Sequence, residues 1–424
     1  MSGFAQKLTL LLTDSALRGR LLFVIGALAV SRVLAAIPIP GINGDQLANF
    51  LNNNQFFGLL NLFSGGGLSG LSIVMLGVGP YITASIIMQL LTIMIPKLKA
   101  LYTEEGEAGR QKFSQYSRLL TLPIAIVQGL SFLLILQREG ILGGLSTFEL
   151  AANLVVIVAG SMLLMWIGEL ISEFGIGNGV SIIIFAGIVA QLPSTLRQTI
   201  FTFDPAQIPL YLFFLVAGAL VIAAVVFITE AERPIPVTYA KRVRGMKFFG
   251  GASTYLPLRL NQAGVIPIIF ALSLLLIPQM VASFLVTLAG QPVAIMIGEG
   301  ILAFLQDLRW YGILYFIFVV LFTYFYTAVT FDPKQISENL QKNGAFVPGV
   351  RPGNSTTEYL GQVITRITLV GALFLGIIAV MPIVMQGLTG IQQLTLGGTA
   401  LLIVVSVVLD LARRVDAQLS IREY

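Results

Sequence analysis

The chain reads GLLNLFSGGGLSG from Gly58 to Gly70 and continues as LSIVMLGVGPYITASIIMQLLTIMI from Leu71 to Ile95. Neither piece carries a charge, and three consecutive glycines break the first. A membrane core about 30 Å thick requires about 20 helical residues, so the first piece is too short to cross it. Irregular backbone is tolerated at that depth only where protein buries it or where it lines a cavity. The sequence therefore predicts a segment at 58–70 that dips into a cavity enclosed by the protein, followed by a spanning helix at 71–95.

The composition indicates an integral membrane protein. Hydrophobic residues make up 56% of the 424 positions and charged residues 11%, and the mean hydropathy is +0.89, which is typical of a membrane protein. The chain has no cysteine and no histidine, which excludes disulfides, thiolate metal sites and the commonest general base. It also lacks the GxxxxGKS or GxxxxGKT phosphate loop. We therefore expect no cofactor and no hydrolysis site, with energy supplied by partners or by the membrane potential.

Ten apolar runs are long enough to be spans, and the charges of the loops between them alternate. Outside the first run, where Arg32 lies, only Arg138, Arg197 and Arg309 fall on one side, and every other Lys and Arg falls on the other. Because positive loops face the cytoplasm, we expect a multi-pass protein of the inner or plasma membrane with both termini cytoplasmic. The runs fall at about 21–38, 71–95, 119–137, 150–171, 180–196, 209–229, 264–286, 311–330, 367–386 and 396–412.

Ten spans divide into five plus five, and an odd number in each half makes the halves inverted relative to each other. The second and seventh runs contain GVGPYITASII at 77–87 and AGVIPIIFALS at 263–273, each with Gly and then Pro near its start. Paired interrupted helices of this kind point to a functional interface between the halves. We expect an N-terminal half over 1–205 and a C-terminal half over 206–424.

Few ionisable residues lie in or near the spans. Arg32 is close enough to the end of its helix to snorkel or to form a pair there, and Glu169 and Glu173 are one turn apart near a span end. No pair of embedded carboxylates and no Ser–His or Cys–His arrangement exists. These residues favour structural roles, and the sequence argues against an enzyme.

Branched aliphatic residues recur on one face of two predicted helices. Val78 and Ile82 are separated by one helical turn, as are Val180 and Ile184. Such stiff side chains can form an apolar constriction that excludes water from a path. Ordinary packing between neighbouring helices explains the same pattern, so spacing alone leaves both interpretations open.

Two loops on the basic side are unusually long, at 230–262 and 331–359. The first mixes aromatic and basic residues, and the second holds Arg351 in the turn AFVPGVRPG. One interpretation is a docking platform for an anionic partner such as ribosomal RNA or an acidic motor surface. The other is a solvated loop whose charge only orients the protein.

Long stretches of the chain closely resemble the SecY/Sec61α family, the central subunit of the protein-conducting channel, in its bacterial form. They follow the family order from the first span to the last, and so cover nearly the whole chain. The stretches are Leu21–Ile42, Asn61–Leu91, Gly106–Leu119, Leu164–Ala190, Leu256–Ala271, Phe325–Gly353 and Gly397–Val405.

The resemblance implies an all-α membrane protein with ten transmembrane helices in two inverted halves around a central pore, closed by a re-entrant plug helix at 58–70. It implies that the protein translocates unfolded secretory proteins and releases transmembrane segments laterally. The residues carried over are a pore ring of Val78, Ile82, Val180, Ile184, Ile269 and Ile403; plug residues Leu60, Asn61, Phe63, Ser64, Gly65, Gly66 and Gly67; lateral-gate contacts Thr83, Gln128 and Asn261; and motor- or ribosome-binding residues Lys241, Arg242, Arg244, Lys247 and Arg351.

The same resemblance implies several partners. They are the small membrane subunits SecE and SecG, the motor ATPase SecA, the ribosome, signal peptides and unfolded preproteins, YidC and SecDF, and the lipid bilayer. Two other classes of protein remain as alternatives. A secondary transporter would also suit inverted halves and broken helices, but requires a polar site in mid-membrane. An insertase acting without a translocase would need a polar groove residue, for which Arg32 is the one candidate.

Overall fold

A computed structural model describes residues 14–39, 61, 64, 66–68, 70–138, 140–142, 146–193, 197, 201, 208–239, 242–244, 247–249, 253–264, 266–288, 292–389 and 393–420. Most of these residues are helical. The helices of the first part of the chain are α2 (Ser15–Ala35), α5 (Gly79–Met94), α6 (Pro96–Thr103), α7 (Gly106–Arg138), α8 (Thr147–Phe174) and α9 (Gly179–Val189). Those of the second part are α11 (Ile208–Glu230), α12 (Ile266–Leu288), α13 (Pro292–Gln306), α14 (Leu308–Thr330), α15 (Pro333–Lys342), α16 (Asn354–Thr389) and α17 (Gln393–Ser420).

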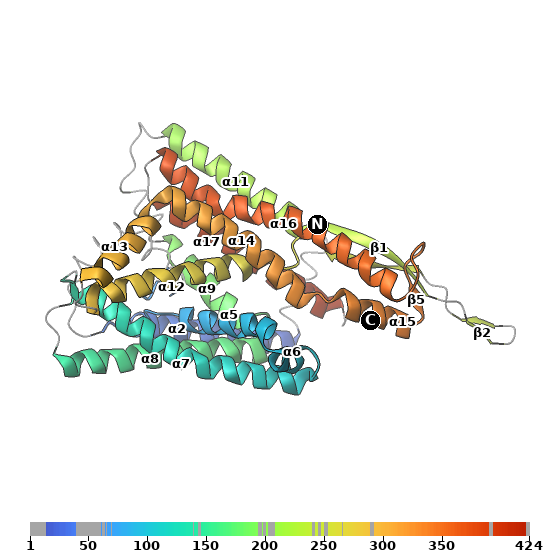
Figure 1. Cartoon of the computed structure of the whole chain (residues 1–424), viewed down its shortest axis with the longest axis horizontal. Coiled ribbons are helices and arrows are strands. Elements are labelled where there is room, and N and C mark those ends of the chain that lie inside the picture. Colours follow the sequence, from blue (N-terminus) through green and yellow to red (C-terminus); the bar gives the residue numbers. More distant parts are fainter. Residues whose placement is uncertain are drawn as a thin grey trace.

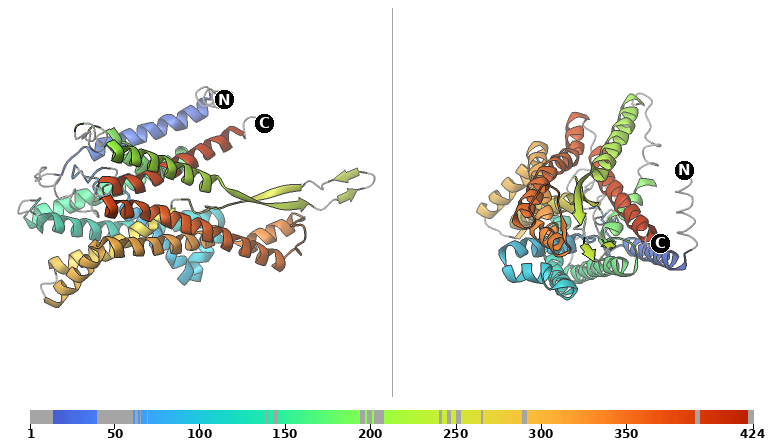
Figure 2. Two further views of the ribbon diagram at one scale, coloured as in Figure 1. Left: turned by 90° about the horizontal axis from the view of Figure 1, so that it is seen from above. Right: turned by 90° about the vertical axis from the view of Figure 1, so that its right-hand side faces the viewer.

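The long helices lie roughly along one axis of the molecule (Figure 1). Helices α2, α5, α7 and α8 lie together in the lower part of this view, and α11, α14, α16 and α17 lie in the upper part, with α9 and α12 between them. The strands, α6 and α15 gather at one end. Figure 2 shows that α2 starts, and α17 finishes, toward that same end. The first and last described helices therefore both have their outer termini on the side of the strands.

Each of the ten apolar runs contains a helix, which agrees with a multi-pass membrane protein. Within the described residues, six helices are long and apolar enough to cross a membrane, or seven if the bent pair α5 and α6 counts as one span. Helix α9 has 11 residues, fewer than the run at 180–196. The sequence analysis also missed α13, a helix of 15 residues that follows α12 and packs against it.

The expectation of a helix over the whole of 71–95 was wrong. Residues 70–78 form turns and a single bridge, and α5 starts only at Gly79. Gly77 has a φ of 59°, a left-handed conformation that suits glycine and interrupts a right-handed helix. Pro80 then occupies the first turn of α5, where its missing N–H costs no hydrogen bond. Helix formation is therefore delayed by about two turns.

Helix α5 ends sharply, as the sequence predicts. Ile95 is extended, with φ −116° and ψ 103°, because the ring of Pro96 disfavours a helical conformation in the residue before it. Helix α6 leaves at 116° to α5. The chain therefore turns away from the membrane axis at the end that also carries the strands.

Helices α8 and α9 have well-defined starts. Ser146 and Glu149 form a reciprocal capping box at the start of α8, and the Asn178 side chain accepts hydrogen bonds from the amides of Val180 and Ser181 at the start of α9. These bonds satisfy amides that have no partner within the helix. The two helices pack against each other.

Five strands lie in the two long loops, where the sequence analysis predicted no regular structure. A three-stranded antiparallel sheet has the order β4 (Ser253–Arg259), β1 (Glu232–Tyr239), β5 (Ala345–Phe346). A separate pair joins β2 (Arg242–Arg244) and β3 (Lys247–Phe249). Ile235 and Val237 on β1 are buried while their neighbours are largely exposed, which is the alternation of a one-sided strand.

Candidate functional site

The segment that precedes α5 is folded tightly into the protein. The amide of Gly66 donates to Asn61 O at 2.8 Å, and the amide of Ser72 donates to Gly67 O at 2.8 Å. The amide of Leu68 donates to Ser64 Oγ at 3.1 Å, and Leu68 is fully buried. Backbone groups that no helix satisfies thus find partners within the turns, as burial in a membrane protein requires.

A local apolar cluster holds this segment against α7 and α8. Leu68, Leu71 and Met75 share it with residues such as Phe132 of α7 and Ile157 of α8. Ser161 of α8 donates its hydroxyl to Gly77 O at 2.9 Å. This part of the segment therefore packs on helices of the first part of the chain, whereas Val74 and Val78 also join an apolar cluster with helices of the second part.

The predicted plug is only partly described. Asn61, Ser64, Gly66 and Gly67 lie in this segment, whereas Leu60, Phe63 and Gly65 lie outside the described residues. The expected plug helix does not extend over the described positions from Ser64 onward, which form turns. Gly66, with a φ of 85°, explains this, since a left-handed residue ends a helix.

The structure places the six residues predicted as a pore ring in the extended apolar core of the helix bundle. Five of them, Val78, Ile82, Ile184, Ile269 and Ile403, belong to a single buried apolar cluster, and Val180 packs against it. They come from the start of α5 and from α9, α12 and α17, which are helices of both parts of the chain. Ile184 and Ile403 are each 1% exposed.

The predicted gate residues are only partly brought together. Gln128 of α7 donates to Thr83 Oγ1 of α5 at 3.5 Å. Asn261 instead donates within its own segment, to Gly264 O at 3.3 Å, and its Oδ1 is buried with no hydrogen-bond partner among the described residues. Helices α5 and α7 both pack against α12. The seam that these helices form is therefore closed.

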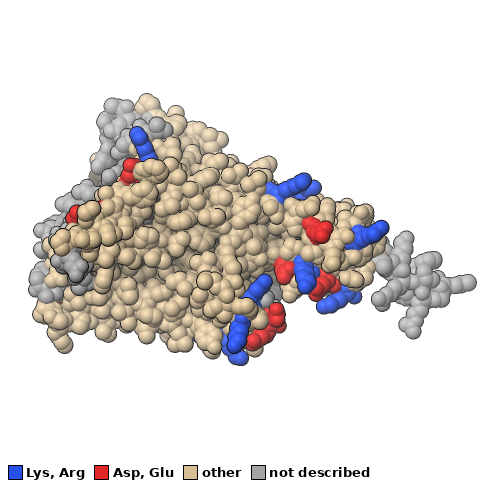
Figure 3. Space-filling model, in the orientation of Figure 1, with Lys and Arg blue, Asp and Glu red and all other residues tan. Residues whose placement is uncertain are grey.

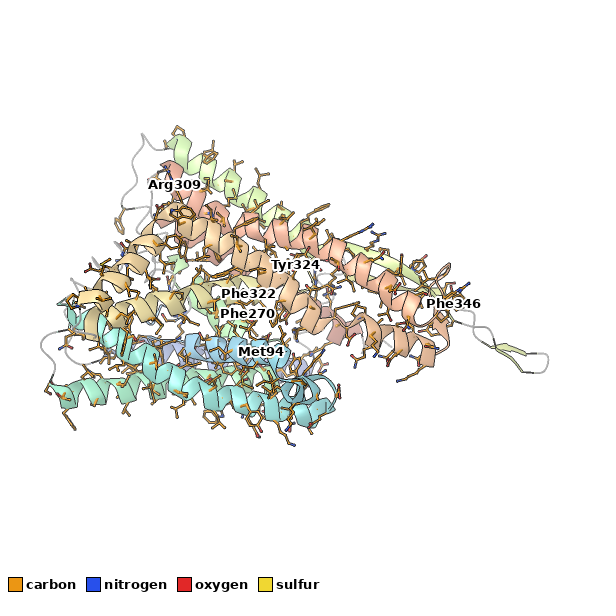
Figure 4. All side chains as sticks on the ribbon, in the orientation of Figure 1. Met94, Phe270, Arg309, Phe322, Tyr324 and Phe346 are labelled. Atoms are coloured by element: carbon orange, nitrogen blue, oxygen red, sulfur yellow. The ribbon has the colours of Figure 1, made fainter. Side chains whose placement is uncertain are left out.

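Aromatic rings fasten α12 to α14 on the other side of this seam. Phe270 meets Phe322 edge-on at 5.9 Å and Tyr326 at 6.2 Å between ring centroids, and Figure 4 shows Phe270 and Phe322 close together in the middle of the molecule. Edge-to-face pairs stabilise such packing beyond the area that they bury. Helices α12 and α14 thus form one wall of the seam, and α5 and α7 form the other.

A polar cavity of about 220 Å³ lies between α9, α14 and α17. Asn178, Asn261, Tyr326 and Arg414 are among the residues that line it. The sequence analysis missed the part of α17 here, where Arg413 donates to Glu230 Oε1 at 2.8 Å and to Thr229 O at 2.5 Å. Basic side chains often bind the last carbonyls of a helix. The sequence does not show which helix lies beside Arg413, so this contact with the end of α11 could not be predicted.

The ionisable residues of the spans have structural partners. Arg32 of α2 donates to Ala186 O of α9 at 2.6 Å, and the guanidinium of Arg118 pairs with Glu169 at 2.5 Å. A charged group inside a membrane protein is stable when carbonyls or an opposite charge satisfy it. Glu173 is exposed. These contacts agree with the structural roles expected from the sequence.

The two long loops form one compact module, here called the platform: the sheet β4-β1-β5, α15 and the start of α16. Its apolar core includes Ile235 of β1, Leu258 of β4, Val347 after β5 and Leu360 of α16. Ser337 of α15 donates to Gly353 O at 2.8 Å. Lysines, arginines and acidic residues gather on this end of the molecule (Figure 3).

Arg351 is exposed on the platform, and Thr356 donates to its carbonyl at 2.9 Å. Arg242, Arg244 and Lys247 lie on the β2–β3 pair, which projects beyond the platform (Figure 1). Lys241 lies outside the described residues. The second loop is thus a folded surface that presents Arg351.

Comparison with known proteins identifies the family. The SecY family model matches residues 72–412. The chain is 44% identical over 420 residues to the protein translocase subunit SecY of Thermus thermophilus, which covers 96% of this chain and 94% of that one. Its fold is similar to that of a solved protein-conducting channel, with a TM-score of 0.67 and 20% identity over 95% and 93% of the two chains. It is also similar to Sec61 in a canine ribosome–channel complex, with a TM-score of 0.63 and 19% identity over 95% and 93%. The chain therefore belongs to the SecY family.

Proposed function

We propose that this chain is the pore-forming subunit of a protein-conducting channel, which translocates unfolded secretory proteins and releases transmembrane segments laterally into the membrane. The observation that carries the proposal is that one apolar core, shared by helices of both parts of the chain, contains Val78, Ile82, Ile184, Ile269 and Ile403, with Val180 packed against it. An apolar constriction can seal a path against ions without binding what passes through it. The two parts are the halves 1–205 and 206–424.

The seam between α5 and α7 on one side and α12 on the other is the lateral gate. An apolar segment in the pore gains free energy by moving into lipid once this seam parts. A hydrogen bond across helices in a membrane is worth about 0.5–2 kcal/mol, so contacts such as Gln128–Thr83 are weak enough to rearrange. The segment around Gly66 and Gly67 is the plug beneath the apolar ring. Its glycines allow tight turns, so that the segment packs closely against the protein without forming a long helix.

The platform is the docking surface for the partners that drive transport. Both ends of the described chain lie on its side of the molecule, and the positive-inside rule places that side, with both termini, in the cytoplasm of an inner or plasma membrane. A solved neighbour of this fold is a ribosome–channel complex, which supports the ribosome as one partner. SecA as motor, SecE and SecG as small subunits, and YidC and SecDF follow from the family. The chain contributes a pore and no enzymatic activity.

Arg351→Glu tests this function. It is expected to reduce partner-driven translocation of a preprotein into membrane vesicles severely, because the exposed charge that meets an anionic partner is reversed. Insertion and folding are expected to be normal, since among the described residues Arg351 contributes only its carbonyl, to Thr356. Lys342→Glu makes the same charge change on the same platform and should have a smaller effect. Normal translocation by Arg351→Glu would contradict the docking role. Ion-coupled flux of a small substrate in proteoliposomes containing this chain alone would favour a transporter instead.

Asn261→Leu tests the gate. In the closed state, Asn261 Oδ1 is buried without a hydrogen-bond partner among the described residues, which costs about 1–3 kcal/mol. Leucine is similar in size to asparagine and has no oxygen atom to leave unsatisfied. The substitution therefore removes this cost, but it also removes the hydrogen bond from Asn261 to Gly264 O. The closed state should therefore gain about 1 kcal/mol, about fivefold in the gate equilibrium. The expected result is poorer export of proteins with weakened signal sequences. Unchanged or improved export of those proteins would contradict the role of Asn261 at the gate.

A further inference from the structure

A second cavity, of about 540 Å³, lies on the outer surface of the helix bundle between α14 and α16. It shares no lining residue with the polar cavity. Its lining includes Leu308, Gly312 and Phe316 of α14 and Val380, Ile383 and Gly387 of α16. These two helices are each long and apolar enough to span the membrane. We call this cavity the α14–α16 groove.

Two glycines shape the groove. A Cβ atom at Gly312 would lie 3.5 Å from Val380 Cγ1, and one at Gly387 would lie 3.5 Å from Leu308 Cδ2. Both distances are ordinary van der Waals contacts, so a larger residue would fit at either position. The groove is open because these two glycines have no side chains to fill it. The groove ends at Phe316. The ring of Phe316 packs directly on Gly376 of α16, since a Cβ atom at that position would lie only 2.7 Å from the ring. From Arg309 to Phe316 the helix rises about 10 Å.

One cation stands at the mouth of this apolar groove. Arg309 lines it, is exposed, and lies at the end of the molecule away from Phe346 of the platform (Figure 4). Its guanidinium has no ion pair among the described residues. The nearby Asp307 carboxylate accepts from the amide of Arg309 at 2.9 Å as a helix cap, so that carboxylate is already engaged with the start of α14.

The neighbours of Arg309 mark the level of a membrane interface. Trp310 is 52% exposed and stacks on Phe304 at 5.6 Å between ring centroids. Helix α13 adds exposed Val293, Met296 and Ile297, yet it is too short to span. Tryptophan beside arginine and exposed apolar side chains is the pattern of the headgroup boundary.

We propose that the α14–α16 groove binds an anionic phospholipid, with the phosphate on Arg309 and the first part of one acyl chain along Gly312 toward Phe316. The charge of the one arginine selects a lipid with net negative charge over a zwitterionic one. The apolar lining, nearly free of polar atoms, selects a chain over water or a polar ligand. The orientation proposed above places this lipid in the outer leaflet, whereas the selectivity itself does not depend on that orientation.

The chain has two tryptophans, so Trp166→Phe leaves Trp310 as a single fluorescent probe beside the groove. This variant would be reconstituted in phosphatidylcholine vesicles that contain a small fraction of acyl-brominated phosphatidylglycerol or, separately, acyl-brominated phosphatidylcholine. Brominated phosphatidylglycerol should quench Trp310 at about one-fifth of the mole fraction that brominated phosphatidylcholine requires. In this background Arg309→Gln should abolish the preference, and Gly312→Leu or Gly387→Leu should weaken quenching by phosphatidylglycerol.

Arg197→Gln is the matched control, because it removes another exposed arginine that does not line the groove, and it should leave the preference intact. Equal quenching by both brominated lipids would overturn the proposal and leave only non-selective contact with surrounding lipid. A preference that survives Arg309→Gln would also overturn it. If both leucine variants leave the quenching unchanged, the lipid does not occupy the groove. A second membrane protein, added in equimolar amount, could abolish the quenching of Trp310 by brominated lipid. That outcome would indicate that a transmembrane helix, and not a lipid, is the natural occupant of the groove, and it would also overturn the proposal.

Discussion

Gly179→Val is expected to prevent correct folding of the helix bundle. A Cβ at residue 179 would lie 1.9 Å from Gly168 O and 2.8 Å from Ile171 Cβ, and the nearest of these atoms is backbone that cannot rotate away. Helices α8 and α9 would have to separate by more than an ångström at their closest approach. Overpacking of a core costs about 1–3 kcal/mol and occasionally more, and forced movement of backbone belongs to the larger values.

The measurement is the fraction of extracted protein that elutes as a single species in size-exclusion chromatography, together with its melting temperature. Gly218→Val is the matched control, because a Cβ at Gly218 of α11 has no atom within 4 Å, and it should behave like the unchanged protein. Gly160→Val should fail like Gly179→Val, since its Cβ would lie 2.1 Å from Ile73 O. Equal yield and equal melting temperature for Gly179→Val and Gly218→Val would show that the close approach of α8 and α9 is unimportant.

Ile184→Asn combined with Ile403→Asn is expected to make the resting channel leak ions. Both side chains are 1% exposed in the apolar cluster, and an amide there gives water a hydrogen-bonding partner. If each amide lowers the free energy of hydrating the constriction by about 1–3 kcal/mol, the conductance rises about 5- to 150-fold per substitution. The effect should appear without a motor or ribosome, because the seal is a property of the closed protein.

Conductance of the purified protein in a planar lipid bilayer checks this result. Leu220→Asn, at a position of α11 that is 66% exposed, is the control, and it should leave the conductance at the level of the unchanged protein. A double variant that folds, inserts and conducts no more than the unchanged protein would mean that the apolar cluster is ordinary helix packing. That outcome would remove the main support for the proposed pore.

The sequence predicted those features that depend on local properties of the chain. Hydropathy located the ten helical regions, since a run of apolar residues in lipid must satisfy its backbone as a helix. The predicted end of the second run at Ile95 agrees with the end of α5 at Met94. Spacing alone paired Val78 with Ile82, but it could not decide between a pore lining and helix packing, because that choice depends on what the other helices bring to the same place.

The strands of the platform were missed for a physical reason. Strand β1 contains Pro234 and Pro236, and proline usually argues against a strand because it cannot donate to the ladder. The alternation of Ile235 and Val237 was the available signal. The neighbouring strand β4 also contains a proline, Pro257, and the other partner, β5, lies about a hundred residues later in the chain and has two residues. Pairing over such a distance is fixed by tertiary packing and not by local pattern.

The first turns of α16 belong to the platform, and the same unbroken helix of 36 residues continues along α14 to the α14–α16 groove. From Asn354 to Pro382 it is a stiff rod about 42 Å long. If the platform tilts by about 5° when a partner docks, the far end of this rod sweeps sideways by about 4 Å. Helix α16 thus converts a small rotation of the platform into a displacement comparable to the width of a side chain at the opposite end of the molecule.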